Sequence, residues 1–221
     1  MTILTAHSGA DGFPDNSLVF VRHALASGAD ALEIDVRRGA DGALRLGHDA
    51  AGEGLPTLDE VFALLAETPG KRVNCDLKER GLEDGVCALA RQRGLAGRVI
   101  LTGSADPERY AASPLLRETA ELWINIEELV PDVYERRDWT AARLLETAER
   151  AASLCARYAL TVLNLNYRLA VPAFAERLAA AQIALSVWTV NEETDIRRFL
   201  EGGVYALTTR NLETALRLAG R

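Results

Sequence analysis

Residues 31–36 read Ala-Leu-Glu-Ile-Asp-Val, and residues 73–78 read Val-Asn-Cys-Asp-Leu-Lys. Both stretches alternate apolar and polar residues, which is the side-chain period of a β-strand. The apolar members share one face, whereas the other face carries two acids in the first stretch and an acid with a lysine in the second. These stretches predict two strands that bury one face and turn their charged face towards a common interior.

The same pattern continues along the whole chain. Short apolar runs alternate with amphipathic helical patterns, and helix starts are marked by the capping box at residues 57–60 and by Asp106-Pro107. Counting gives eight main strands, each followed by a helix, with one extra hairpin strand near Leu44. Because such alternation favours parallel pairing through right-handed crossovers, we predict an α/β fold, a single (β/α)₈ TIM-barrel domain over residues 1–221.

An open, doubly wound sheet is the alternative architecture. The first strand is not followed by Gly-x-Gly-x-x-Gly, which argues against a dinucleotide-binding version of that sheet. In detail, we expect the first helix at about residues 15–26 and expect Asn191 and Asn211 to cap the last two helices.

Composition and charge limit the classes of function. The formal net charge is −7, from 25 basic and 32 acidic residues, and no basic cluster suggests a nucleic-acid partner. An acidic protein repels phosphate esters unless a cation intervenes. The three cysteines have no metal-type spacing, and we see neither a signal peptide nor an apolar run of about 18 residues. We expect a cytoplasmic protein without integral membrane association.

Polar residues concentrate where barrel enzymes place their sites, at the carboxyl ends of strands. Three carboxylates, Glu33, Asp35 and Asp76, are expected on neighbouring strands and on the inward face. Such a cluster is costly as bare anions, and a hard cation with oxygen ligands relieves the repulsion. We predict one divalent cation there, Mg²⁺ or Ca²⁺.

Two of the three histidines, His7 and His48, also fall at strand ends beside these acids. Two imidazoles next to a cation suit in-line phosphoryl transfer, because one removes a proton from the attacking hydroxyl and the other protonates the leaving alkoxide. Taken singly, each feature also has a structural explanation. The acids can be solvated, Asp76 and Lys78 can form an ordinary ion pair, and Trp188 or either histidine can belong to the core.

Nine short motifs follow one another along the chain. In order, they are His7-Ser8-Gly9, Pro14-Asp15-Asn16, Glu33-Ile34-Asp35-Val36, Asp41-Gly42, His48-Asp49, Pro56-Thr57-Leu58, Asp76-x-Lys78, Trp188-Thr189-Val190-Asn191 and Gly203-Val204. Through this ordered set the chain resembles the glycerophosphodiester phosphodiesterase family, within the PI-PLC-like phosphodiesterase superfamily. The motifs extend over nearly the whole chain.

The resemblance implies metal-dependent hydrolysis of small-molecule glycerophosphodiesters, in lipid metabolism, to glycerol phosphate and an alcohol. It implies His7 and His48 as the catalytic acid and base, and Glu33, Asp35 and Asp76 as metal ligands. The residues it implies for substrate or phosphate binding are Lys78, Asp15, Asn16, Ser8 and Trp188.

The chain also departs from the family pattern. Ser8 stands where the family usually has an arginine that contacts phosphate, so a bidentate donor is missing there. Asp15 and Asp76 stand where glutamate is usual, and Thr209 replaces a usual acid. The insertion between His48 and Pro56 is reduced, so we expect an open site or a lid from residues 127–139.

Three other functions fit parts of the pattern. A non-catalytic phosphate-binding relative would explain the departures, and a sphingomyelinase D-like phospholipase that forms a cyclic phosphate would share the barrel and the Asp-x-Lys motif. A metal-dependent sugar isomerase or aldolase would also gather acids and histidines at strand ends. The sequence does not specify the alcohol group, the metal or the oligomeric state.

Overall fold

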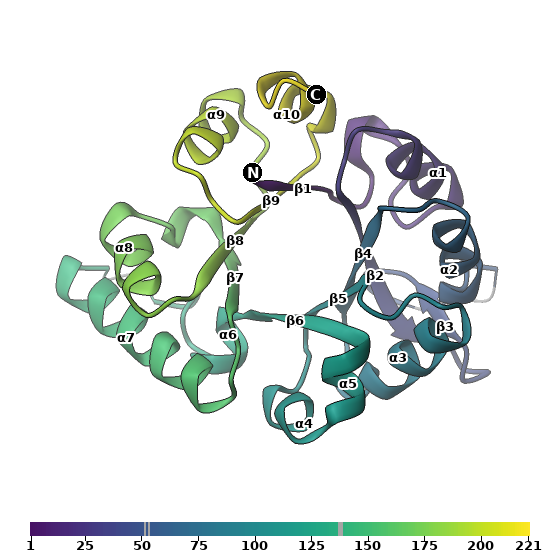
Figure 1. Ribbon diagram of the computed structural model, residues 1–221, viewed down its shortest axis with the longest axis horizontal. Coiled ribbons are helices and arrows are strands. Elements are labelled where there is room, and N and C mark those ends of the chain that lie inside the picture. The colour runs from purple at the N-terminus through teal and green to yellow at the C-terminus, as the bar shows by residue number, and fades with distance from the viewer. Residues whose placement is uncertain (51, 53, 137–138) are drawn as a thin grey trace.

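A computed structural model describes residues 1–50, 52, 54–136 and 139–221 and shows a ring of strands surrounded by helices (Figure 1). In the described part of the chain, eight strands pair in parallel around the ring. They are β1 (Ile3–Ala6), β2 (Ala31–Arg38), β4 (Arg72–Leu77), β5 (Val99–Gly103), β6 (Ala120–Asn125), β7 (Val162–Asn166), β8 (Ala184–Trp188) and β9 (Ala206–Thr209). Because β1 pairs with both β2 and β9, the sheet closes, which confirms the barrel and excludes the open sheet.

The extra hairpin strand is also confirmed. β3 (Leu44–Leu46) pairs antiparallel with the end of β2, outside the ring. The helices that cover the barrel are α1 (Leu18–Ala26), α2 (Leu58–Ala66), α3 (Glu83–Gln92), α4 (Pro107–Ala112), α5 (Pro114–Thr119), α6 (Ile126–Leu129), α7 (Ala141–Arg157), α8 (Pro172–Ala180), α9 (Glu193–Glu201) and α10 (Leu212–Leu218). None of the helices in these described ranges is long and apolar enough to cross a membrane.

Strand alternation separates two environments. The outward residues of β2, such as Leu32 and Ile34, join the main core beneath the helices. The inward residues nearest the amino-terminal end of the barrel form a separate apolar cluster, made by Ala31, Ile100, Trp123, Val162 and Ala206. This cluster fills the bottom of the barrel, so a site has room only at the opposite end, where the strands finish.

Helix starts were predicted with mixed success. Thr57 and Glu60 form the expected capping box. The first helix begins at Leu18 with Ser17 as its cap, later than predicted, because Asn16 has a left-handed backbone, with φ of +53°, and Ser17 is extended. Asn211 stands at the N-cap position of α10 as expected, although its side chain makes no capping hydrogen bond. The expectation for Asn191 was wrong, because Glu192 is the N-cap residue of α9. The side chains of Asn191 and Asn211 bond to the chain segments near the barrel mouth instead.

Candidate active site

A cavity of about 550 Å³ opens at the carboxyl ends of the strands. Most of the residues predicted for the site meet there. The cavity is lined by His7, Asp15, Glu33, Asp35, His48, Asp76, Lys78 and Trp188. It is also lined by Glu127 and Glu128, at the start of the segment considered as a lid, and by Arg210, which was not predicted. Ser8 and Asn16 do not line it. Their side chains lie behind the acids.

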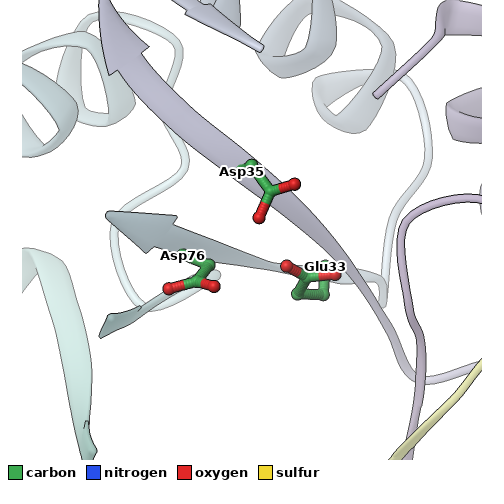
Figure 2. Close-up of side chains that lie close together, drawn as sticks. All are labelled: Glu33, Asp35 and Asp76. Carbon is green, nitrogen blue, oxygen red and sulfur yellow. The ribbon is translucent and has the colours of Figure 1, made fainter. Parts of the chain in front are cut away.

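The three predicted acids converge (Figure 2). Glu33 and Asp35 project from β2, and Asp76 projects from β4, where it is the register partner of Asp35. One carboxylate oxygen from each lies within 4.8 Å of the others. Glu33 and Asp35 are buried, and Asp76 is half-buried. The alternation seen in the sequence is therefore sufficient to assemble this cluster, because parallel pairing aligns the inward faces of neighbouring strands.

The crowding of the acids is visible in the protonation of Glu33. Burial is the largest cause that raises the pKa of Glu33, and the negative charges of Asp35 and Asp76 also raise it, whereas His7 and the Ser8 N–H lower it. Together these effects place the pKa of Glu33 at about 7. A carboxylate in such a position is stabilised as an anion only when positive charge comes close.

Asp76 adds a second sign that the cluster fits a cation. Its Oδ1 is buried and has no hydrogen-bond partner among the described residues. Gly103, with φ of +71°, leaves the space beside this oxygen. A buried carboxylate oxygen without a donor is costly, and coordination to a metal removes that cost. Three oxygen donors from carboxylates form a set that suits Mg²⁺ or Ca²⁺.

Lys78 is the counter-ion present within the chain. Its Nζ lies 2.8 Å from Oδ1 of Asp35 and 2.6 Å from Oδ2 of Asp76. Burial alone would lower the pKa of Lys78, but Asp76 and Asp35 outweigh it and raise the pKa well above its usual range. The ammonium therefore stays charged, and two carboxylates already share that charge.

His7 is oriented by its own loop. Its Nδ1 donates to the Ser8 carbonyl oxygen at 2.8 Å, which leaves Nε2 with the lone pair in the neutral ring. The Ser8 N–H donates to Oε2 of Glu33 at 2.9 Å. Ser8 thus links His7 to the acid cluster through its backbone, while its side chain accepts from the Asn16 N–H at 2.7 Å.

Asn16 fixes Asp35 by two hydrogen bonds. Its Nδ2 donates to Oδ2 of Asp35 at 2.7 Å, and its Oδ1 accepts from the Asp35 N–H at 3.0 Å. Asn16 is buried and has φ of +53°, a left-handed conformation that asparagine tolerates better than most residues. This geometry makes Asn16 a positioning group for Asp35, in a place where it does not face the cavity.

His48 also lines the cavity, after the end of β3. Its side chain is 66% exposed, and its Nδ1 lies 2.7 Å from Oδ1 of Asp49. The backbone is held because the His48 carbonyl oxygen accepts from Nε of Arg37 at 2.8 Å. His7 and His48 therefore border the same cavity, one half-buried and one exposed.

An arginine that the sequence reasoning missed stands next to Asp15. Nη1 of Arg210 lies 2.9 Å from Oδ1 of Asp15, and Nη2 lies 3.1 Å from Oδ2. Side chains of β9 alternate between the two faces of the sheet, and those of Ala206 and Thr208 point into the barrel. Arg210 comes two residues after Thr208, so the same alternation could have placed it at the mouth of the barrel. Asp15 is not one of the three acids whose oxygens converge.

Hydrogen-bonded amides line the remaining wall. Nδ2 of Asn164 donates to Oδ1 of Asn125 at 2.8 Å, and Nδ2 of Asn125 donates to Oε1 of Glu127 at 2.9 Å. Oε2 of Glu127 is buried without a partner among the described residues, and burial raises the pKa of Glu127. Trp188 meets Tyr134 edge to face, with ring centroids 6.1 Å apart.

Thr209 explains one departure from the family pattern. Its Oγ1 accepts from the Asn211 N–H at 2.9 Å, and the residue is fully buried. Thr209 does not line the cavity, in contrast to its neighbours Thr208 and Arg210. Its hydroxyl therefore serves the turn that leads into α10, and an acid is not required at this position for that purpose.

Comparisons with known proteins agree with the barrel fold and identify the family. The profile of the Glycerophosphoryl diester phosphodiesterase family matches residues 50–214, about three quarters of the chain. A glycerophosphodiester phosphodiesterase of Caldanaerobacter subterraneus subsp. tengcongensis is 24% identical over 98% of this chain and 97% of its own length. The family match begins just after His48, so His7, Glu33, Asp35 and His48 lie outside the matched residues.

Solved structures share the fold. A glycerophosphodiester phosphodiesterase of Thermotoga maritima superposes with a TM-score of 0.73 at 19% identity, covering 100% of this chain and 99% of that one. A phosphodiesterase of Oleispira antarctica in complex with the product sn-glycerol-3-phosphate superposes with a TM-score of 0.73 at 17% identity, covering 99% of this chain and 96% of that one. At these identities the structures support the fold alone.

Proposed function

Since the chain belongs to the glycerophosphoryl diester phosphodiesterase family, we propose that its cavity hydrolyses glycerophosphodiesters to glycerol phosphate and an alcohol. Family membership makes the chain a phosphodiesterase. The observation that best supports the proposal is the convergence of three carboxylates and two histidines on one cavity. A phosphodiester is anionic, and only a site with a cation can hold it beside three acids.

Glu33, Asp35 and Asp76 would hold one divalent cation, either Mg²⁺ or Ca²⁺. When bound, the cation supplies positive charge that offsets the charge of the phosphate oxygens. The protein prepares this position in advance: Ser8 fixes Glu33, and Asn16 fixes Asp35. Residues that hold ligands in place typically change metal affinity by about 10- to 100-fold when they are removed.

His7 and His48 act as the acid–base pair. One accepts the proton of the attacking water, and the other donates a proton to the leaving alkoxide. The bond from Nδ1 of His7 to the Ser8 carbonyl oxygen supports this role, because it directs proton exchange to Nε2. The exposed position of His48 suits a group that exchanges its proton with solvent between turnovers.

Hydrolysis of glycerophosphocholine and glycerophosphoethanolamine tests the proposal, measured with Mg²⁺, with Ca²⁺ and with a chelator. We expect activity with a cation only, and a loss of about 10²- to 10⁴-fold in H7A and in H48A. H23A is the matched control, because His23 pairs with Asp11 at 2.9 Å and does not line the cavity. Full turnover in both H7A and H48A would contradict the assignment.

Two further measurements separate the roles and the products. An aryl phosphodiester has a leaving group that needs no proton, so the variant that lacks the general acid should recover activity on it, whereas the variant that lacks the base should not. Phosphorus NMR of the products distinguishes glycerol phosphate from a cyclic phosphate. Accumulation of the cyclic phosphate would show that a substrate hydroxyl, and not water, attacks.

A further inference from the structure

The charges that line the cavity leave an anionic substrate with few partners. Among the described residues, six acids line it, and two side chains carry a permanent positive charge, Lys78 and Arg210. The Lys78 ammonium is shared between Asp35 and Asp76 at 2.8 and 2.6 Å. It is therefore already neutralised by the acids that surround it, and it has little capacity left for a phosphate.

Arg210 is in a different position. Its guanidinium meets the carboxylate of Asp15 through Nη1 and Nη2. Both side chains line the cavity and are about half exposed to solvent. A guanidinium has five N–H donors in a fixed plane, and two of them suffice for this pair. Arg210 thus keeps donors that can bind the non-bridging oxygens of a phosphodiester in the bidentate manner that arginine favours.

The backbone holds this guanidinium at the mouth. The Arg210 N–H donates to Oδ1 of Asn191 at 2.9 Å, and the Arg210 carbonyl oxygen accepts from the Asp11 N–H at 2.8 Å. Asp15 is fixed as well, because it lies over Gly9: a Cβ on Gly9 would stand 1.7 Å from Oδ1 of Asp15. Segments after β1, β8 and β9 therefore cooperate to present one arginine beside His7.

We propose that Arg210 is the phosphate-binding residue of this site, and that Asp15 is a positioning residue that orients its guanidinium. This inference rests on the proposed function, since it names the group that receives the phosphodiester. Ser8, which stands where the family usually has a phosphate-binding arginine, is buried behind Glu33 and has no cationic side chain. In this chain the guanidinium of Arg210, just after β9, takes the place of that missing donor.

The test combines turnover with ligand binding. KM and kcat for glycerophosphocholine are measured with Mg²⁺ for R210A, R210K and D15N, and the affinity for sn-glycerol 3-phosphate is measured by calorimetry. For R210A we expect KM and the dissociation constant to rise about 10- to 100-fold, the range for a lost charge-assisted hydrogen bond, with a smaller change in kcat. R210K should recover only part of the affinity, because an ammonium lacks the planar fork.

D15N should weaken binding less than R210A, and in the R210A background it should have no further effect. The control is R93A, which removes an exposed arginine with the same two-pronged pairing, at 2.8 and 2.6 Å to Asp59, away from the cavity. Thermal melts of each variant report whether the fold is kept.

The outcomes distinguish the two proposals. If the wild type hydrolyses no diester but binds sn-glycerol 3-phosphate through Arg210, the proposed function fails and the role of Arg210 stands. If the wild type is active and R210A keeps KM and affinity within twofold, the role of Arg210 is wrong. A wild type that binds no sn-glycerol 3-phosphate, with or without Mg²⁺, also overturns it.

Discussion

The carboxylate of Asp76 lies directly against the Cα of Gly103. A Cβ built on Gly103 would stand 2.1 Å from Oδ1 of Asp76 and 2.4 Å from the Leu77 carbonyl oxygen. The end of β5 therefore shapes the end of β4, and a glycine outside the set of charged residues determines where an acid of the cluster lies.

G103A should lower both stability and metal affinity. The left-handed φ of +71° and the clash with Asp76 together predict a loss of about 2–5 kcal/mol in the free energy of unfolding. Asp76 must move to admit the methyl group, so Mg²⁺ should bind more weakly. Urea unfolding and calorimetry measure the two effects.

Gly97 provides the control for this variant. It also has a left-handed backbone, with φ of +78°, but a Cβ there meets nothing within 4 Å. G97A should lose only about 1–2 kcal/mol of stability and leave Mg²⁺ affinity unchanged. If G103A and G97A behave alike in both assays, the contact with Asp76 has no consequence for the site.

N16A should loosen Asp35 and weaken the cation site. The variant leaves the Asp35 N–H and one carboxylate oxygen without their partners, at 3.0 and 2.7 Å in the wild type. We expect metal affinity to fall about 10- to 100-fold and stability to fall by about 1–3 kcal/mol. Calorimetry with Mg²⁺ and thermal melts check the two values.

Q182A is the control for N16A. Gln182 also has a positive φ, of +59°, so alanine there meets a similar backbone strain, and Gln182 does not line the cavity. An equal loss of metal affinity in Q182A, or an unchanged affinity in N16A, would show that Asn16 does not position Asp35.

The acid cluster was predictable because it depends on local alternation. Glu33, Asp35 and Asp76 could be placed on inward faces from two short stretches, and parallel pairing then set Asp35 beside Asp76. The barrel followed from the repeated order of strands and helices. Both inferences use periodicity, which a sequence displays directly.

Partners that are distant in the chain could not be predicted in this way. Asn191 looked like a helix cap, but its side chain accepts from Arg210, 19 residues away. Asp15 and Arg210 are 195 residues apart and meet only because the barrel closes between β9 and β1. The position of Arg210 could have been found by extending the period of β9 beyond the strand, whereas its pairing with Asp15 could not.

The raised pKa of Glu33 predicts a pH dependence of stability in the metal-free protein. With a folded pKa of about 7 against an ordinary value of 4.5, the folded state binds the proton more tightly than the unfolded state. This contribution is present below pH 4.5 and is lost as the pH rises to about 7 and above. In EDTA, the wild type should therefore lose stability from pH 5 to pH 8.

E33Q should remove most of that loss. The free energy of unfolding of the wild type, relative to that of E33Q, should fall by an amount on the order of 3 kcal/mol across this pH range. Urea unfolding at each pH measures it, and E118Q, on the exposed face of α5, should follow the wild type. Mg²⁺ should restore the stability of the wild type at pH 8 and not that of E33Q. Parallel pH profiles of wild type and E33Q would contradict the prediction.

Lys78 should compete with the metal, because its ammonium occupies the space between Asp35 and Asp76. K78Q removes the positive charge that pairs with both of these acids. We expect the metal-free variant to be less stable by about 2 kcal/mol or more, since two acids lose their counter-ion, and we expect Mg²⁺ to bind about tenfold more tightly.

K71Q is the control for K78Q, because Lys71 donates to backbone carbonyl oxygens of Ser27 and Ala29 and does not line the cavity. Calorimetry at pH 8 gives the affinity, and thermal melts in EDTA give the stability. Weaker Mg²⁺ binding in K78Q would mean that the ammonium holds the two carboxylates in the geometry that the cation needs. The change in Mg²⁺ affinity therefore distinguishes two roles of Lys78. If the ammonium competes with the cation, K78Q binds Mg²⁺ more tightly, and if the ammonium orients the carboxylates, K78Q binds Mg²⁺ more weakly.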